Sequence, residues 1–357
     1  MSSLDIPSLS AEQLRRIKLA GRITGQVGGA VAGLTAVSAW ILLRQAADAR
    51  RVIPMAEAPP PRGDGVYGAK FPGKPLSLCI LGDSTAAGYG VHRPRETPGA
   101  LFATGISRRL HRPVRLHRLA VVGSISAGLP WQVDAALEHR PDLAVIFIGG
   151  NDVTHASGRP AAVRHLADAV RRLRESDCKV VVGTCPDLGA IKPIKPPLRW
   201  LARRWSRQLA ALQTVAVVEA GGRTVSLGNL LGPMFEADPG RMYSSDRFHP
   251  SAEGYARAAA VMMPTVLAAL GEDDRVAGVP GLLAEGVRTL PEAADEAVRA
   301  PGTEVSPTRV NGRDRGPAGR WAQLRRHPWF GEPRHWFGSR STGDGAVRYT
   351  PEDHQVG

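Results

Sequence analysis

"LSLCILGDSTAAG", residues 76–88, is an apolar run typical of a buried β-strand, followed by a Gly-Asp-Ser turn and small residues. Ser84 in this turn is either a nucleophile or an ordinary turn serine. The triplet alone is weak evidence, because a chain of this composition contains one by chance about one time in ten. The choice therefore depends on what the rest of the chain supplies.

The pattern of that first strand repeats from Pro75 to about Leu270. Short apolar runs such as "LAVIFIGG" and "VVVGT" alternate with stretches such as "PAAVRHLADAVRRLRESD", whose apolar residues recur three and four apart. Alternating strands and helices predict an α/β fold with a mostly parallel sheet and helices on both faces. Such sheets bind ligands at the carboxyl ends of their strands, so the residues that follow each strand are the candidates for a site.

Chemistry-bearing residues stand at these strand ends and just before the last amphipathic helix. An ester-cleaving serine needs a base, and the imidazole of His249, with an ordinary pKa near 6.5, suits that task. Asp246, three residues earlier, can orient the imidazole. Backbone N–H groups of Ser84 and Gly123 and the carboxamide of Asn151 can stabilise an oxyanion. The set predicts ester hydrolysis without a metal or an organic cofactor.

The order Gly-Asp-Ser, Gly, Gly-Gly-Asn-Asp, Asp-x-x-His-Pro resembles the GDSL or SGNH hydrolase family of esterases, lipases and carbohydrate deacetylases. The resemblance covers residues 75–270 and implies a three-layer α/β/α domain. It implies that Ser84 is the nucleophile, that Gly123 and Asn151 are oxyanion donors, and that Asp246 and His249 are the acid and the base. Two positions depart from the family pattern, Thr85 and Arg118, and the second leaves Gly128 as an alternative to Gly123.

The segments before this domain predict attachment to a membrane. Residues 23–43 carry no charge over 21 positions and follow a basic segment, 1–22. We expect a single transmembrane anchor at 23–43, with a cleaved signal peptide and a buried or interfacial helix as alternatives. Residues 44–74, rich in Pro and Gly, are expected to form a linker. This order of parts predicts a cell-membrane protein whose catalytic domain is extracytoplasmic.

The segment after the domain, residues 271–357, is acidic, then arginine-rich, with Pro and Gly throughout. We expect it to be largely disordered, with one short helix near "GLLAEGVRTL". A Trp-Phe-Gly repeat at 329–331 and 336–338 is either a docking motif or part of an unremarkable tail.

The basic residues of this chain are spread along it. The formal net charge is +13, yet no zinc-finger, RNP-like or arginine-run signature accompanies it, so we expect no nucleic-acid partner. The stretch Lys192–Arg207 holds six basic residues and two tryptophans. One interpretation is a helix with a core-facing stripe of Leu198, Leu201, Trp205 and Leu212 and a solvated arginine face of Arg199, Arg203 and Arg207. The other is a helix resting on an anionic membrane.

The three cysteines, Cys79, Cys178 and Cys185, include no CxxC pair and are expected to be small buried hydrophobes. The leading prediction is therefore a membrane-anchored serine esterase or lipase that cleaves lipid acyl esters or sugar O-acetyl esters through an acyl-enzyme on Ser84. The alternative is a non-catalytic binding or scaffold domain on the same fold at the membrane.

Overall fold

The computed structural model describes residues 40–48, 51, 59–155, 158–228, 238–271, 287–300, 302–308, 315–316 and 319–326 of the 357-residue chain. Its centre is a sheet with the strand order β1-β3-β2-β4-β5-β6-β8-β10-β7, and β9 pairs with β10 beside that path. The five strands β3, β2, β4, β5 and β6 are parallel. They are Val114–Arg118, Leu76–Gly82, Leu143–Phe147, Lys179–Gly183 and Arg223–Val225.

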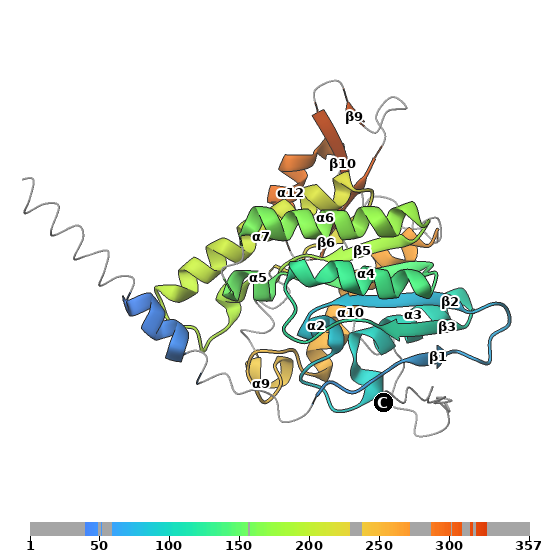
Figure 1. Ribbon diagram of the computed structural model, residues 1–357, viewed down its shortest axis with the longest axis horizontal. Coiled ribbons are helices and arrows are strands. Elements are labelled where there is room, and N and C mark those ends of the chain that lie inside the picture. The colour runs from blue at the N-terminus through green and yellow to red at the C-terminus, as the bar shows by residue number, and fades with distance from the viewer. Residues whose placement is uncertain are drawn as a thin grey trace, which may run out of the picture.

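Alternate side chains of β2 enter two separate cores, as the two-residue period of a strand requires. Leu78 and Ile80 pack with helices α3 and α10, whereas Cys79 and Leu81 pack with α4 and α6. These helices are α3 Pro98–Leu110, α10 Ala252–Ala269, α4 Leu129–Glu138 and α6 Arg159–Glu175. The result is the expected three-layer α/β/α arrangement (Figure 1). Each of these fully buried aliphatic side chains contributes about 1.5–3 kcal/mol.

One further long helix and several short ones complete these layers or cover their ends. Helix α7, Leu198–Glu219, packs against α6 and α12. The short helices are α2 Ser84–Ala87, α5 Gly150–Thr154, α9 Pro239–Met242, η1 Pro94–Glu96, η2 Ser126–Gly128 and η3 Leu188–Ala190.

The prediction of a largely disordered segment after 270 is wrong for its described parts. These form β7 Val287–Thr289, α12 Leu290–Arg299, β8 Thr303–Pro307, β9 Arg315–Gly316 and β10 Gly319–Arg326. Strand β8 pairs antiparallel with β6, so the sheet is mixed and only its centre is parallel. Glu304 of β8 is fully buried and accepts hydrogen bonds from Arg223 and Thr265, which explains how so polar a strand is kept inside. The Trp-Phe-Gly repeats and "GLLAEG" lie outside the described residues.

The expected linker 44–74 also contributes to the fold. Its β1, Gly65–Tyr67, pairs antiparallel with β3, and Asp64 accepts a hydrogen bond from the backbone N–H of Arg118. Residues 40–48 are helical. Most of the predicted anchor at 23–43 lies outside the described residues, and none of the helices that the structure describes has the length and apolar character needed to cross a bilayer.

Candidate active site

Ser84 lies where β2 ends and α2 begins. Asp83 caps α2 by accepting a hydrogen bond from the backbone N–H of Thr85 at 2.9 Å. Gly82 before it has φ +130°, and a Cβ there would lie 1.8 Å from the carbonyl oxygen of Phe147, so only glycine fits against strand β4. The sharp turn presents the Ser84 hydroxyl at the carboxyl edge of the sheet.

His249 and Asp246 come from a tight loop before α10 and meet Ser84 there. The Ser84 Oγ lies 2.9 Å from His249 Nε2, and His249 Nδ1 lies 2.6 Å from Asp246 Oδ2. With a proton on Nδ1, the imidazole donates to Asp246 and accepts the Ser84 hydroxyl hydrogen at Nε2. The rings of Tyr89 and Phe248 pack edge-on against the imidazole and restrict its rotation.

The second carboxylate oxygen of Asp246 organises the loop itself. Asp246 Oδ1 accepts hydrogen bonds from the Ser244 hydroxyl and from the backbone N–H groups of Phe248 and His249. Burial acts to raise the pKa of Asp246, but the hydrogen bonds from His249, Ser244 and Phe248 outweigh it and lower the pKa to about 2. The carboxylate is therefore ionised at neutral pH and can hold an imidazolium opposite it.

Asn151 and Gly123 are brought to the same edge by backbone contacts. Asn151 lies in the first turn of α5 and donates from Nδ2 to the Ser124 carbonyl at 2.9 Å, while the N–H of Val121 donates to the Gly82 carbonyl at 3.1 Å. The loop that carries Gly123 is thus held between the nucleophile turn and Asn151.

Gly123 fits the expected role of a backbone donor better than the alternative, Gly128. Gly123 has φ +80°, and its N–H has no acceptor among the residues that the structure describes. The N–H of Gly128 already donates to the Ile125 carbonyl at 2.9 Å. Of the two, the N–H of Gly123 is the one available to a developing oxyanion.

Arg118, which departs from the family pattern, supports this region in another way. Its guanidinium lies 3.4 Å from the carbonyl oxygens of Pro60 and Ala87. Ala87 is the last residue of α2, so a cation stabilises the carboxyl end of the helix that begins with Ser84.

Three buried polar side chains, to which the sequence assigned no role at the site, join the strand ends to one another. Gln132 on α4 accepts from the N–H and donates to the carbonyl of Gly82, and also donates to the Ser124 hydroxyl. Gln213 on α7 donates to the carbonyl of Ile148 and accepts from the N–H of Cys185. Asp152 is buried and accepts hydrogen bonds from the N–H and the hydroxyl of Ser126. The only sequence signal is a polar residue at a core-facing position of a helix.

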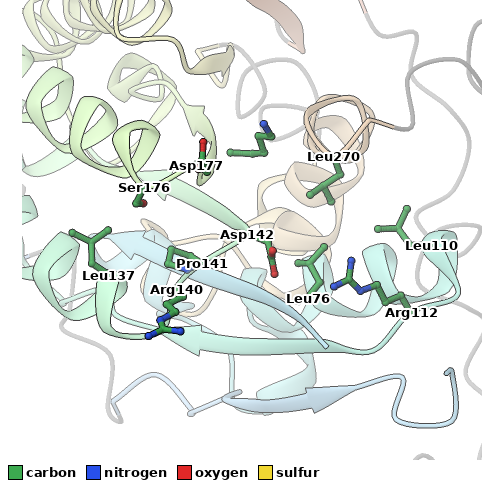
Figure 2. A pocket seen from close by; sticks show the side chains of 11 residues that line it. Leu76, Leu110, Arg112, Leu137, Arg140, Pro141, Asp142, Ser176, Asp177 and Leu270 are labelled. Carbon is green, nitrogen blue, oxygen red and sulfur yellow. The ribbon is translucent and has the colours of Figure 1, made fainter. Parts of the chain in front are cut away.

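The cavity beside the catalytic groups is small and mostly apolar. Its volume is about 70 Å³. Besides Ser84, Asn151 and His249, its lining includes Phe147, Ile148, Leu188, Ile191, Leu227 and Phe248. A larger hollow of about 450 Å³ lies at the opposite, amino edge of the parallel strands, where Arg112, Arg140 and Asp142 face it (Figure 2). None of the predicted site residues lines that hollow.

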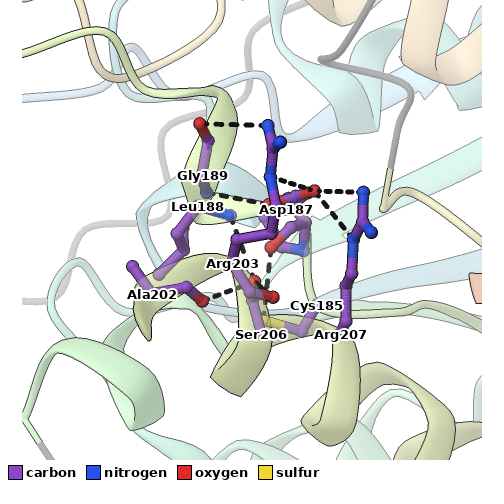
Figure 3. Close-up of polar contacts among 9 residues, drawn as sticks. Cys185, Asp187, Leu188, Gly189, Ala202, Arg203, Ser206 and Arg207 are labelled. Carbon is purple, nitrogen blue, oxygen red and sulfur yellow. Dashed lines mark hydrogen bonds and ion pairs between the residues drawn. The ribbon is translucent and has the colours of Figure 1, made fainter. Parts of the chain in front are cut away.

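Two arginines of the predicted solvated face of helix α7, Arg203 and Arg207, pair with a buried carboxylate, although their side chains stay 41% and 39% exposed. Asp187, only 1% exposed, forms ion pairs with Arg203 at 3.3 Å and Arg207 at 3.0 Å and accepts the N–H of Gly189 (Figure 3). These arginines therefore hold the loop 186–191, which supplies Leu188 and Ile191 to the cavity. Leu212 is 45% exposed, so the predicted core-facing stripe is wrong at that position.

The cysteines are buried and unpaired, as expected. Burial raises the pKa of the Cys178 thiol to about 12 and that of Cys185 well above its ordinary value, which makes both poor nucleophiles. Within the described part of the chain, no cluster of His, Cys, Asp or Glu has the makings of a metal site.

Comparison with known proteins identifies the family of this chain. The family model described as "GDSL-like Lipase/Acylhydrolase family" matches residues 80–257. A GDSL-like esterase from Mycobacterium tuberculosis is 46% identical over 245 residues, which are 65% of this chain and 77% of that protein. These matches identify the protein as an esterase or lipase. The chain belongs to the GDSL-like lipase/acylhydrolase family, which confirms the resemblance.

Solved structures give weaker matches. The crystal structure of TesA shares 22% identity with this chain, at a TM-score of 0.42, over 54% of this chain and 99% of that one. A catalytic mutant of Axe2, an acetylxylan esterase from Geobacillus stearothermophilus, shares 17% identity at a TM-score of 0.42, over 56% and 96% of the two chains.

Proposed function

We propose that this carboxylic ester hydrolase works through an acyl-enzyme on Ser84, with His249 as the general base and Asp246 as its orienting partner. The observation that carries the proposal is the continuous hydrogen-bonded chain from Ser84 Oγ through His249 to Asp246, beside an apolar cavity. Nucleophile, base and orienter within hydrogen-bond reach are the arrangement that activates a serine hydroxyl.

The reaction follows from where the protons lie. As Ser84 Oγ bonds to the ester carbonyl carbon, its proton passes to His249 Nε2, and the imidazolium is stabilised by ionised Asp246. Collapse of the tetrahedral adduct breaks the bond to the alcohol, which leaves with that proton. Water then attacks the acyl-enzyme with His249 as base, releases the carboxylic acid, and returns the proton to Ser84.

The oxyanion of each tetrahedral adduct needs fixed donors. We assign the N–H groups of Ser84 and Gly123 and the Nδ2 of Asn151 to this role. In the structure Asn151 Nδ2 donates to the Ser124 carbonyl, which keeps the carboxamide oriented between turnovers. One such donor is worth about 10²–10³ in turnover.

The cavity supports a short acyl group as the part of the substrate bound beside Ser84. Its volume of about 70 Å³ is below the roughly 150 Å³ of a cavity that takes up benzene. An acetyl or similarly short acyl group fits such a space, with its chain against Ile148, Leu188 and Leu227. Of the two predicted substrate classes, this favours O-acetyl esters over long-chain lipid acyl esters.

The experiment is covalent labelling and turnover with the full chain. Wild type is expected to react with a fluorophosphonate and to hydrolyse p-nitrophenyl acetate faster than longer esters. Ser84→Ala should lose both activities, while Ser77→Ala, at the opposite end of β2, keeps them. Labelling that survives in Ser84→Ala refutes the nucleophile, and a preference for long acyl chains refutes the short-acyl substrate.

We further propose that the chain is attached to a cell membrane through residues 23–43, with residues 52–357 extracytoplasmic. The uncharged run and its basic flank support the attachment. Alkaline phosphatase fused after Gly357 should be exported and active in a bacterial host. A fusion at Leu270 is unsuitable because it deletes β8. An inactive phosphatase together with a fluorescent cytoplasmic fusion at the same point contradicts the orientation.

A further inference from the structure

The described helix at residues 40–48 lies against the beginning of α7 (Figure 1). The Gln45 side chain donates to the carbonyl of Pro196 at 2.6 Å and accepts from the N–H of Leu198 at 3.1 Å. Leu198 begins α7, whose N-cap, Pro197, provides no side-chain acceptor. Gln45 supplies the missing cap, so two segments about 150 residues apart in sequence are joined.

Large apolar side chains remain exposed on both sides of this junction. Trp40 is 58% exposed, Leu43 is 71% exposed and Trp200 is 64% exposed. Single exposed hydrophobic residues are normal on a protein surface. Three of them, two being tryptophan, within about two helical turns of one contact mark a surface that a partner covers.

The segment beside this junction also carries cations without neutralising partners. The side chains of Lys195, Arg199 and Arg204 form no ion pair or hydrogen bond among the described residues, in contrast to Arg203. No Asp or Glu occurs in the sequence between Asp187 and Glu219. The unneutralised positive charge indicates that the partner is anionic.

A bilayer with anionic headgroups fits both properties and the course of the chain. Tryptophan and basic side chains are the residues that settle at the headgroup level of membranes. The uncharged run 23–43 ends within the helix that carries Trp40 and Leu43. We propose that Trp40, Leu43, Lys195, Arg199, Trp200 and Arg204 form a membrane-facing surface that rests on anionic lipid headgroups.

This surface adds a function to the attachment proposed above, on which it rests. The loop that lines the catalytic cavity with Leu188 and Ile191 leads within four residues into Lys195. Contact with lipid therefore fixes the height and tilt of the catalytic domain and keeps that loop near the headgroups. Esters carried at the membrane surface are then the substrates within reach.

Fluorescence quenching of Trp200 tests the contact without measuring hydrolysis. The full chain is bound to phosphatidylcholine vesicles containing phosphatidylglycerol, with brominated acyl chains as quencher. The component of the signal lost in Trp200→Phe should fall on the order of twofold on quenching, as for an interfacial tryptophan. The control is Trp131, which is 79% exposed on α4. The component of the fluorescence that is lost in Trp131→Phe should not be quenched.

The charges are tested by Lys195→Glu combined with Arg204→Glu, which should abolish the Trp200 quenching. The control pair, Arg108→Glu with Arg109→Glu on α3, should leave it intact. Flotation with the vesicles reports attachment separately. A chain that floats with Trp200 unquenched overturns the surface but leaves the anchor, and a chain that does not float overturns both. Quenching that is equal without phosphatidylglycerol overturns the role of the charges.

Discussion

Burial of the Asp83 side chain makes its ionisation oppose folding. Burial raises its pKa from 3.8 to about 6, against the effects of the Thr85 N–H and of His249. The native state therefore holds the proton more tightly than the unfolded chain does. Stability falls as the pH rises from about 4 to about 6 and is level above that. A shift of about two units at about 1.4 kcal/mol each means a loss of about 3 kcal/mol.

Asp83→Asn removes this titration and keeps an N-cap, because the asparagine oxygen can accept the same N–H. The free energies of unfolding of the two proteins, from urea titrations at several pH values between 4 and 7, should diverge in favour of the variant by about 3 kcal/mol. If the amide changes the free energy of unfolding by a constant amount, that amount cancels, because the prediction concerns only how the difference between the two proteins changes with pH. Parallel stability curves would refute the assignment of the titration to Asp83.

Three further substitutions and one truncation test the fold. Asp187→Asn weakens the bonds to two guanidinium groups and should lower the free energy of unfolding by about 1–3 kcal/mol in urea; an unchanged midpoint contradicts the role of this carboxylate. Gly82→Ala should prevent folding, because its Cβ would lie 1.8 Å from a carbonyl oxygen, whereas Gly123→Ala, with φ +80° and open space, should cost about 1–2 kcal/mol. If circular dichroism shows the same loss of structure in both glycine variants, the predicted difference between them is refuted. Truncation after Gly271 should leave the domain insoluble or much less stable; a soluble fragment with wild-type thermal unfolding argues against a structural role of the last strands.

The meeting of the candidate catalytic groups was predictable because parallel strands all end at one edge of the sheet. Once 76–82 and 143–147 are recognised as strands, Ser84 and Asn151 must meet there. The three-residue spacing of Asp246 and His249 places both on one loop. The oxyanion glycine was less certain from sequence, because the choice between Gly123 and Gly128 depends on which N–H is already bonded.

The remaining contacts depend on tertiary structure and leave little trace in the sequence. Strand β8 reads "TEVSP" and looks like a polar tail, because the burial of its Glu304 depends on Arg223 and Thr265, which lie on other elements. The four-residue spacing of Arg203 and Arg207 predicts that they share one face of a helix. The neighbouring sequence does not indicate that this face contacts Asp187. Helical periodicity separates the inside from the outside of a helix but does not identify its neighbours.

The return of the chain to the sheet after α10 also imposes an order on biosynthesis. Strand β6 leaves the ribosome about 80 residues before β8, which at 5–20 residues per second is about 4–16 seconds. Ser84 and His249 have both been synthesised by then, while one side of β6 still lacks its permanent neighbour. Until β8 arrives, that open side can pair with another nascent chain or be bound by a chaperone. Completion of the sheet is thus tied to translation past Pro307, well beyond the last of the proposed catalytic residues.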